Sequence, residues 1–218
     1  MRLDRLSAAV VLGVGLFLGG VVGAAPPTSK PVEPVQPDAN VKAPLRRPPT
    51  KPAELGPEHA ILSGFAGHWK WKLHPIPDAA TAATPDSVVS GPPDTEGTAE
   101  GKLLMGGRFA EVRHEGTVNG QKFEAMMLCG FDAVINRYAS TWIDNASNAM
   151  VHFVGTYDPG KKQLTMTAHY SDPATRRLTI AKTVTTFVDA TTWTYDEYVS
   201  HAVGERESHT MTITFKKG

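Results

Sequence analysis

The chain has 218 residues, of which 41% are hydrophobic and 20% charged, and its 22 Lys and Arg balance its 22 Asp and Glu. The charges are unevenly distributed along the chain. Residues 1–24 carry two basic and one acidic side chain, and residues 25–57 carry five basic and three acidic side chains. The remaining segment, residues 58–218, carries 15 basic and 18 acidic side chains. Only the last segment is long enough for an ordinary folded domain. Because it is mildly acidic and has no basic stripe, no nucleic-acid partner is expected.

The first 24 residues have the layout of a secretory signal peptide. Arg2 and Arg5 precede an uncharged apolar run over residues 6–22, and small residues follow it before Pro26. This layout predicts cleavage after Ala24 and an exported protein, periplasmic or extracellular. The run is also just long enough to cross a bilayer, so an uncleaved anchor that tethers the protein to a membrane is the alternative.

Residues 25–57 form a predicted linker. The segment holds ten of the 17 prolines of the chain and no aromatic residue. Such a composition cannot bury enough apolar surface to fold, so we expect an extended, disordered spacer. The repeats Pro31-Val-Glu-Pro34 and Pro34-Val-Gln-Pro37 loosely match Pro-rich docking ligands, which is the alternative function for this segment.

Residues 58–218 are predicted to form one all-β domain. Runs rich in Thr, Val and aromatic residues alternate with turn clusters and give ten predicted strands, over residues 68–74, 96–104, 108–118, 121–130, 134–144, 149–157, 163–171, 176–188, 191–201 and 206–216. A short amphipathic helix over residues 58–66 precedes them. This pattern predicts a single up-and-down antiparallel barrel, with a two-sheet sandwich as the alternative.

A series of short motifs links the domain to known barrels. Gly67-His68-Trp69 is similar to the G-x-W opening of lipocalins and fatty-acid-binding proteins, in which the Trp plugs one end of the barrel. The whole series resembles the bacterial family catalogued as domain of unknown function 1579, a relative of the calycin barrels. Its motifs are Glu58-His59-x-x-Leu62, Gly67-x-Trp69, Gly106-Gly107-Arg108-Phe109, Gly120-x-x-Phe123-Glu124, Gly130-Phe131-Asp132, Thr141-Trp142-Ile143-Asp144, Gly155-Thr156-Tyr157-Asp158 and Asp172-Pro173. The resemblance implies a lipocalin-like barrel but no particular activity, and Phe131 and Thr212 depart from the residues usual in the family.

The likeness to fatty-acid-binding proteins implies two further features. Those barrels hold a ligand carboxylate with a buried Arg, and Arg108 alternates with the apolar Ala110 and Val112, so Arg108 is a candidate anchor. Pairing of Arg108 with a carboxylate such as Glu124 or Asp132 is the alternative. The long loop of residues 75–94 stands where those proteins have a helical lid, so we expect it to cover the open end of the barrel.

The pairing register of the two strands in the last hairpin can be predicted from their side chains. The register that gathers the large apolar side chains on one face pairs Val199 with His209, Glu197 with Met211, Tyr195 with Ile213 and Trp193 with Phe215. In this register Tyr198 is the one misfit, and His209 is the one His on a clearly apolar face. Glu197 and His209 then lie one diagonal apart, and such a buried pair must be satisfied by each other, by water or by a ligand.

The leading functional hypothesis is a barrel that binds a small hydrophobic or amphipathic molecule. The candidate ligand-binding residues are Trp71, Arg108, Met127, Trp142, Tyr195, His209 and Met211. A hydrolase or isomerase that uses Glu197 and His209, and a haem or metal barrel that uses His209, are the alternatives. The sequence contains no G-x-S-x-G or H-E-x-x-H motif, so no catalytic residue, metal site or cofactor is predicted, and a binding protein is favoured over an enzyme.

Overall fold

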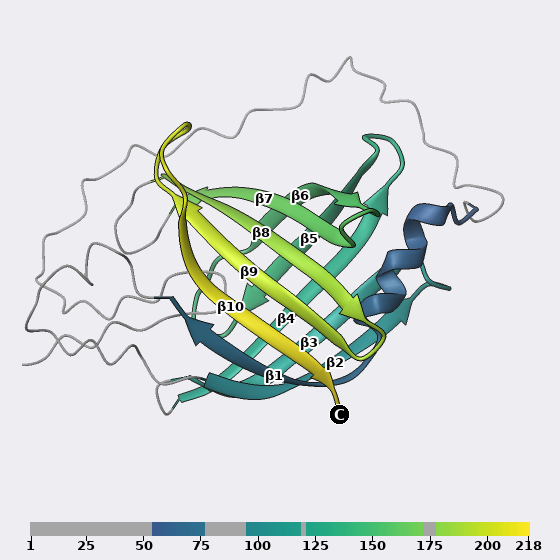
Figure 1. Ribbon diagram of the computed structural model, residues 1–218, viewed down its shortest axis with the longest axis horizontal. Helices are drawn as coiled ribbons and strands as arrows, with labels where there is room; N and C mark the ends of the chain where they lie inside the picture. The colour runs from purple at the N-terminus through teal and green to yellow at the C-terminus, as the bar shows by residue number, and fades with distance from the viewer. Residues whose placement is uncertain (1–53, 77–94, 119–120, 172–177) are drawn as a thin grey trace, which may run out of the picture. The chain divides into compact units, whose positions relative to one another are not determined.

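The computed structural model describes residues 54–76, 95–118, 121–171 and 178–218. These residues form one 3-10 helix and ten strands (Figure 1): η1 (Pro57–Phe65), β1 (Gly67–Pro75), β2 (Thr95–Leu104), β3 (Phe109–Val118), β4 (Gln121–Asp132), β5 (Arg137–Asp144), β6 (Val151–Asp158), β7 (Gln163–Ser171), β8 (Leu178–Asp189), β9 (Thr192–Ser200) and β10 (Ser208–Lys217). The expected signal peptide at 1–24, and almost all of the expected linker at 25–57 and lid at 75–94, lie outside the described residues. No helix in the described ranges is long and apolar enough to span a membrane.

The strands form a closed antiparallel barrel in which each strand pairs with its neighbour in the chain and β1 pairs with β10. The predicted up-and-down barrel is therefore confirmed, and the sandwich alternative is wrong. All ten predicted strands are present, with ends within three residues of the predicted ones. The sequence pattern was sufficient here because, along most of each strand, side chains alternate between a buried and a solvated face.

Strand β1 illustrates this alternation. Trp69, Trp71 and Leu73 point inward and are no more than 3% exposed, whereas Lys70 and Lys72 between them are exposed. The same alternation continues around the barrel and produces one hydrophobic core. Because the sheet has no free edge, the core is the interior of the barrel itself.

The helix η1 closes one end of the barrel together with an aromatic floor, which we define as Phe65, Trp69, Phe187, Trp193 and Phe215. Trp193 stacks on Phe215 with ring centroids 3.5 Å apart, and Phe65 meets Trp193 edge to face at 5.5 Å. The Trp69 indole N–H donates to the carbonyl of Phe65 at 2.9 Å and so fixes the end of η1 on β1. Trp69 thus lies where the G-x-W resemblance implied, at the end of the barrel that η1 covers.

Glycines allow the closest contacts at this end. A Cβ atom on Gly101 of β2 would lie 1.8 Å from the carbonyl oxygen of Phe65, which is backbone and cannot rotate away. Gly97 and Gly116 make room for the ring of Trp71 in the same manner, with Cβ positions 2.4 Å and 2.6 Å from its Cζ2 atom. The seating of η1 on β2 therefore requires glycine at position 101.

We expect Gly101→Ala to destabilise the domain by about 2 kcal/mol, because η1 and β2 must move apart to admit the methyl group. Gly160→Ala is the matched control, since its Cβ would meet only the side chain of Asp158, at 3.3 Å. Urea unfolding of both variants measures the difference. A change below about 0.5 kcal/mol for Gly101→Ala would contradict the close contact.

Candidate ligand site inside the barrel

An interior cavity of about 50 Å³ lies above the aromatic floor. Its apolar lining comes from η1, from strands β4 to β7 and from β9 and β10, namely Phe65, Met127, Trp142, Phe153, Leu164, Met166, Trp193, Ile213 and Phe215. Its polar lining residues are His114, Ser140, Thr183, Thr185 and Tyr195. A cavity of this size holds a few water molecules, whereas sites for drug-sized ligands begin near about 300 Å³.

The structure brings three of the predicted site residues together in the cavity wall, namely Met127, Trp142 and Tyr195. Trp71 is buried elsewhere, and its indole N–H donates to the carbonyl of Thr98 at 2.8 Å. Met211 is fully buried in the interior, opposite Glu197, but is not part of the cavity wall. Alternation along the strands therefore identified inward positions, but not the height of each along the barrel axis.

Arg108 does not point into the barrel as expected. It belongs to the turn between β2 and β3, where its Nη1 atom donates to the carbonyl of Met105 at 2.8 Å in an exposed setting. Met105, Gly106 and Gly107 all have positive φ angles in this turn. Because β3 begins only at Phe109, the inward alternation of the strand does not extend back to Arg108.

The predicted register of the last hairpin is correct for most of its length and fails at His209. The pairs Glu197–Met211, Tyr195–Ile213 and Trp193–Phe215 are confirmed. A register shift between His209 and Met211 then places His209 opposite Tyr198 instead of Val199. The extra residue is Thr210, whose hydroxyl lies 3.2 Å from the carbonyl oxygen of Glu197 and 2.8 Å from its Oε2 atom.

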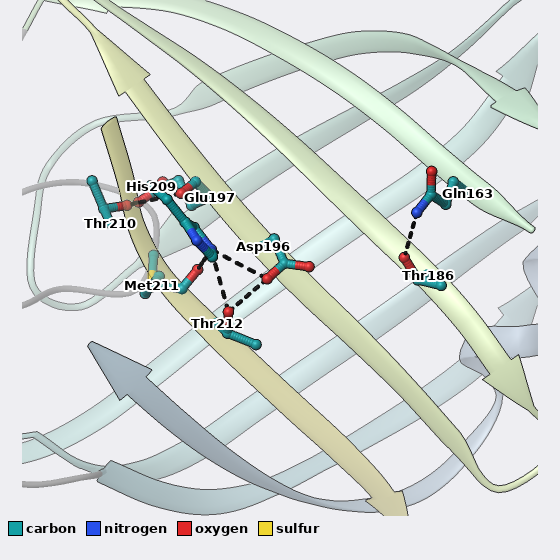
Figure 2. Close-up of polar contacts among 8 residues, drawn as sticks. All are labelled: Gln163, Thr186, Asp196, Glu197, His209, Thr210, Met211 and Thr212. Atoms are coloured by element: carbon teal, nitrogen blue, oxygen red, sulfur yellow. Dashed lines mark hydrogen bonds and ion pairs between the residues drawn. The ribbon is translucent and has the colours of Figure 1, made fainter. Parts of the chain in front are cut away.

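This bulge puts His209 in a cluster on the outer face of the sheet (Figure 2). Its Nε2 atom is 3.2 Å from Asp196 Oδ1, and Thr212 donates to the same oxygen at 2.6 Å. The His209 ring stacks on the ring of Tyr198, with centroids 4.6 Å apart. This contact explains why Tyr198, the one large side chain that did not fit the apolar face in the predicted register, lies on the outer face. The predicted Glu197/His209 pair is therefore wrong, and a haem or metal ligand at His209 would bind outside the barrel.

Glu197 points into the barrel interior and is 5% exposed. Thr210 donates to its Oε2 atom, while its Oε1 atom has no hydrogen-bond partner among the described residues. Burial raises the pKa of this carboxyl from 4.5 to about 7, and the hydrogen bond from Thr210 offsets part of the shift. Burial, and then the neighbouring groups of Glu197 and Tyr170, raise the pKa of Tyr195 well above its ordinary value.

His114 is a further buried titratable group of the interior, and the sequence analysis missed it. Its ring lies between those of Trp142, at 5.2 Å, and Phe215, at 5.7 Å. Burial lowers its pKa from 6.5 to about 4, so the imidazole is neutral at neutral pH. The signal was present, because Ala110, Val112 and His114 alternate along β3.

Four buried side-chain atoms in the described part of the chain have no hydrogen-bond partner: His114 Nδ1, Thr179 Oγ1, Trp193 Nε1 and Glu197 Oε1. All four side chains are on the inward faces of their strands. Leaving such an atom unpaired costs about 1–3 kcal/mol, so native proteins contain few of them. Within the same ranges, no group of three or more His, Cys, Asp and Glu side chains could hold a metal ion.

Comparisons with known proteins match one family model and several solved structures. The family model described as "Protein of unknown function (DUF1579)" matches residues 54–217. Among solved structures, the chain is similar to one titled "Structure of a redesigned beta barrel, mFAP1, bound to DFHBI", at 10% sequence identity and a TM-score of 0.36. That match covers 72% of this chain and 98% of the other. The search of curated proteins found no match.

The buried carboxyl of Glu197 and the buried imidazole of His114 should have opposite effects on the pH dependence of stability. The Glu197 carboxyl is ionised above pH 4.5 when unfolded but only above about pH 7 when folded, so its burial lowers stability as the pH rises between these values. The unfolded His114 is protonated below pH 6.5 but the folded one only below about pH 4, so its burial lowers stability as the pH falls. In the wild type the two slopes largely cancel.

Single substitutions should separate these slopes. We expect the unfolding free energy of Glu197→Gln, measured relative to wild type, to increase by about 2–3 kcal/mol as the pH rises from about 4.5 to 6.5. Over the same range, the unfolding free energy of His114→Phe relative to wild type should decrease by a similar amount. Urea unfolding across this pH range measures both. Identical pH dependence in the wild type and both variants would show that neither group titrates as its burial requires.

Proposed function

We propose that this chain, which belongs to the DUF1579 family of proteins of unknown function, binds a small amphipathic molecule inside its β-barrel. The observation that carries the proposal is an apolar interior cavity whose wall contains two polar atoms without a hydrogen-bond partner among the described residues, His114 Nδ1 and Trp193 Nε1. Binding sites for small molecules combine these two properties, an apolar wall and a few polar groups that fix the orientation of the ligand.

The apolar wall supports the binding of a hydrocarbon body. Met127 and Met166 contribute to it, and methionine side chains adapt readily to a new shape because they are unbranched and have three rotatable bonds. The side chain of Met127 is only partly buried, whereas the indole of Trp142 is held by its hydrogen bond to Asp144 Oδ2. We therefore expect the ligand to enlarge the cavity by moving the methionine side chains, since about 50 Å³ is too small for it as it stands.

The polar groups support a ligand that also carries a hydrogen-bonding group. A purely apolar ligand would leave the four unpartnered atoms as they are, whereas a hydroxyl or amine could bond to one of them. Glu197 and His209 face opposite sides of the hairpin, so an enzyme that uses them together has no support here. Binding without chemical conversion accounts for the interior most simply.

We also propose that the barrel acts outside the cytoplasm. The support is the sequence of residues 1–57, an apolar run behind two arginines followed by a Pro-rich segment. Mass spectrometry of the protein from its own host should find a mature chain that begins at Ala25. An intact N-terminus on a protein in the cytoplasmic fraction would contradict export. An intact N-terminus on a protein in the membrane fraction would show that the apolar segment is not cleaved and anchors the protein to the membrane.

Ligand entry can be observed at the four tryptophan indole groups. Trp142 and Trp193 line the cavity, and the indole N–H of Trp142 donates to Asp144 Oδ2 at 2.8 Å. Trp69 and Trp71 are not part of the cavity wall, and their indole N–H groups donate to the backbone carbonyls of Phe65 and Thr98. Titration with hexanol should therefore shift the indole N–H resonances of Trp142 and Trp193 in a saturable manner and leave those of Trp69 and Trp71 almost unchanged. Absence of saturable shifts at Trp193 would contradict binding in the interior.

Two leucine variants on the same strand supply the control for this titration. Ser140→Leu on β5 adds side-chain volume to the cavity wall and should weaken hexanol binding at least about tenfold. Ala139→Leu adds a side chain of the same kind to the outward-facing neighbour position and should leave the affinity unchanged. Equal affinities in both variants would place the hexanol outside the barrel.

A further inference from the structure

We infer that the polar group of the ligand is a protonated amine that binds the inward-facing carboxyl group of Glu197. This inference rests on the proposed binding of a small molecule in the interior and names its chemical class. It starts from the side chain of Glu197, which is 5% exposed. One oxygen of its carboxyl group accepts a hydrogen bond from Thr210, and the other has no partner in the described part of the chain. A buried carboxyl oxygen without a donor is an acceptor that a ligand can satisfy.

The strand register places this carboxyl next to the cavity. Glu197 on β9 is paired with Thr183 on β8, and Thr183 is part of the cavity wall. Tyr195, two residues earlier on the same face of β9, is also part of the wall. Because β9 runs away from the aromatic floor, Glu197 borders the cavity on the side opposite η1. A ligand whose hydrocarbon body fills the cavity would carry its polar group toward this carboxyl.

The bulge at Thr210 orients the carboxyl for such a contact. The Thr210 hydroxyl donates to Oε2 of Glu197 at 2.8 Å, so the group is held by one oxygen (Figure 2). Its other oxygen, Oε1, is buried and has no partner among the described residues. The carboxyl is therefore fixed before any ligand arrives, which reduces the entropy lost when a donor binds.

The charges around Glu197 favour a cation over an anion. Buried side chains in the described ranges include no Lys or Arg, and Glu197 interacts electrostatically with the phenol of Tyr195, which in turn interacts with that of Tyr170. His114, on the inward face of β3, is neutral at neutral pH. Lys182, Asp196 and His209 belong to the outer face of the sheet. A ligand carboxylate would thus meet a second carboxylate and no cation, whereas an ammonium group would complete an ion pair.

The pKa of the carboxyl gives this interaction a recognisable pH dependence. Burial raises the pKa of Glu197 to about 7, so below that pH the free protein holds a neutral carboxylic acid. An ammonium group binds the ionised form, so its binding releases a proton in this range. The affinity for an amine should therefore rise about tenfold per pH unit up to pH 7 and level off above it.

Three six-carbon probes test the inference by calorimetry between about pH 5.5 and 8.5, where an alkylamine stays protonated and an alkylcarboxylate ionised. Hexylamine should bind with the pH dependence given above. Hexanol should bind with less than about a threefold change across the range, and hexanoate should bind at least about tenfold more weakly than hexylamine at pH 8. The wild-type pH profile alone tests the inference, so it does not depend on the folding of a variant.

Two neighbouring substitutions identify the carboxyl responsible. Glu197→Gln should remove the pH dependence of hexylamine binding and weaken it at least about tenfold, with little effect on hexanol. Asp196→Asn removes a carboxylate from the adjacent, outward-facing position of β9 and should change neither property.

The possible failures separate the two proposals. Binding of hexanol with no preference for hexylamine over hexanoate would overturn the amine inference and leave the interior site standing. Absence of binding by all three probes would overturn both. Retention of the pH dependence in Glu197→Gln would assign the proton to another group and would also overturn the inference.

Discussion

The pairing of β1 with β10 closes the sheet, and the placement of every other side chain depends on this closure. It runs over seven residue pairs, from Trp69 opposite Lys217 to Pro75 opposite Met211. A closed sheet has an inside and an outside, so neighbouring residues of one strand meet entirely different environments. Asp196 lies on the outer face beside His209, whereas Glu197, the next residue, lies in an apolar interior, and one of its oxygens has no partner among the residues that the structure describes.

The interior holds polar groups that its own residues do not satisfy. An apolar residue in place of His114 or Glu197 would avoid the cost of burying a titratable group. This cost is largest at low pH for His114 and at high pH for Glu197. Natural sequences break the rules of packing mainly where function requires it. The family has no activity attached to it, so these two positions are the most direct indication on the molecule of what the barrel does.

The sequence was sufficient for the fold because strand alternation is a local signal. It identified ten strands, the closing helix and the inward positions of Met127, Trp142 and Tyr195. The same alternation predicts that His114, two residues after Val112, also points inward. The sequence analysis did not name it, because among the histidines it considered only His209 to lie on an apolar face. Burial alternates more regularly along β3 than along β9, so the inward position of His114 follows from the sequence pattern alone.

Two features could not be read from alternation. The bulge at Thr210 adds one residue to β10 without any Gly or Pro to mark it, and this single residue moves His209 from the inner face to the outer. The turn before β3 likewise starts the strand one residue after Arg108. In both cases an irregularity of one residue reversed the direction of a side chain, and each reversal removed a predicted functional group from the interior.

The account depends most directly on a carboxyl group that is buried and fixed inside the barrel. The most direct measurement is the pH titration of the Glu197 side-chain carboxyl carbon by NMR, with Glu197→Gln used to assign the resonance. The account predicts a midpoint near pH 7, about the value that burial imposes on this group. A midpoint near the ordinary value for glutamate, about 4.3, would mean that water reaches the carboxyl, and it would contradict both the buried geometry and the ligand chemistry drawn from it.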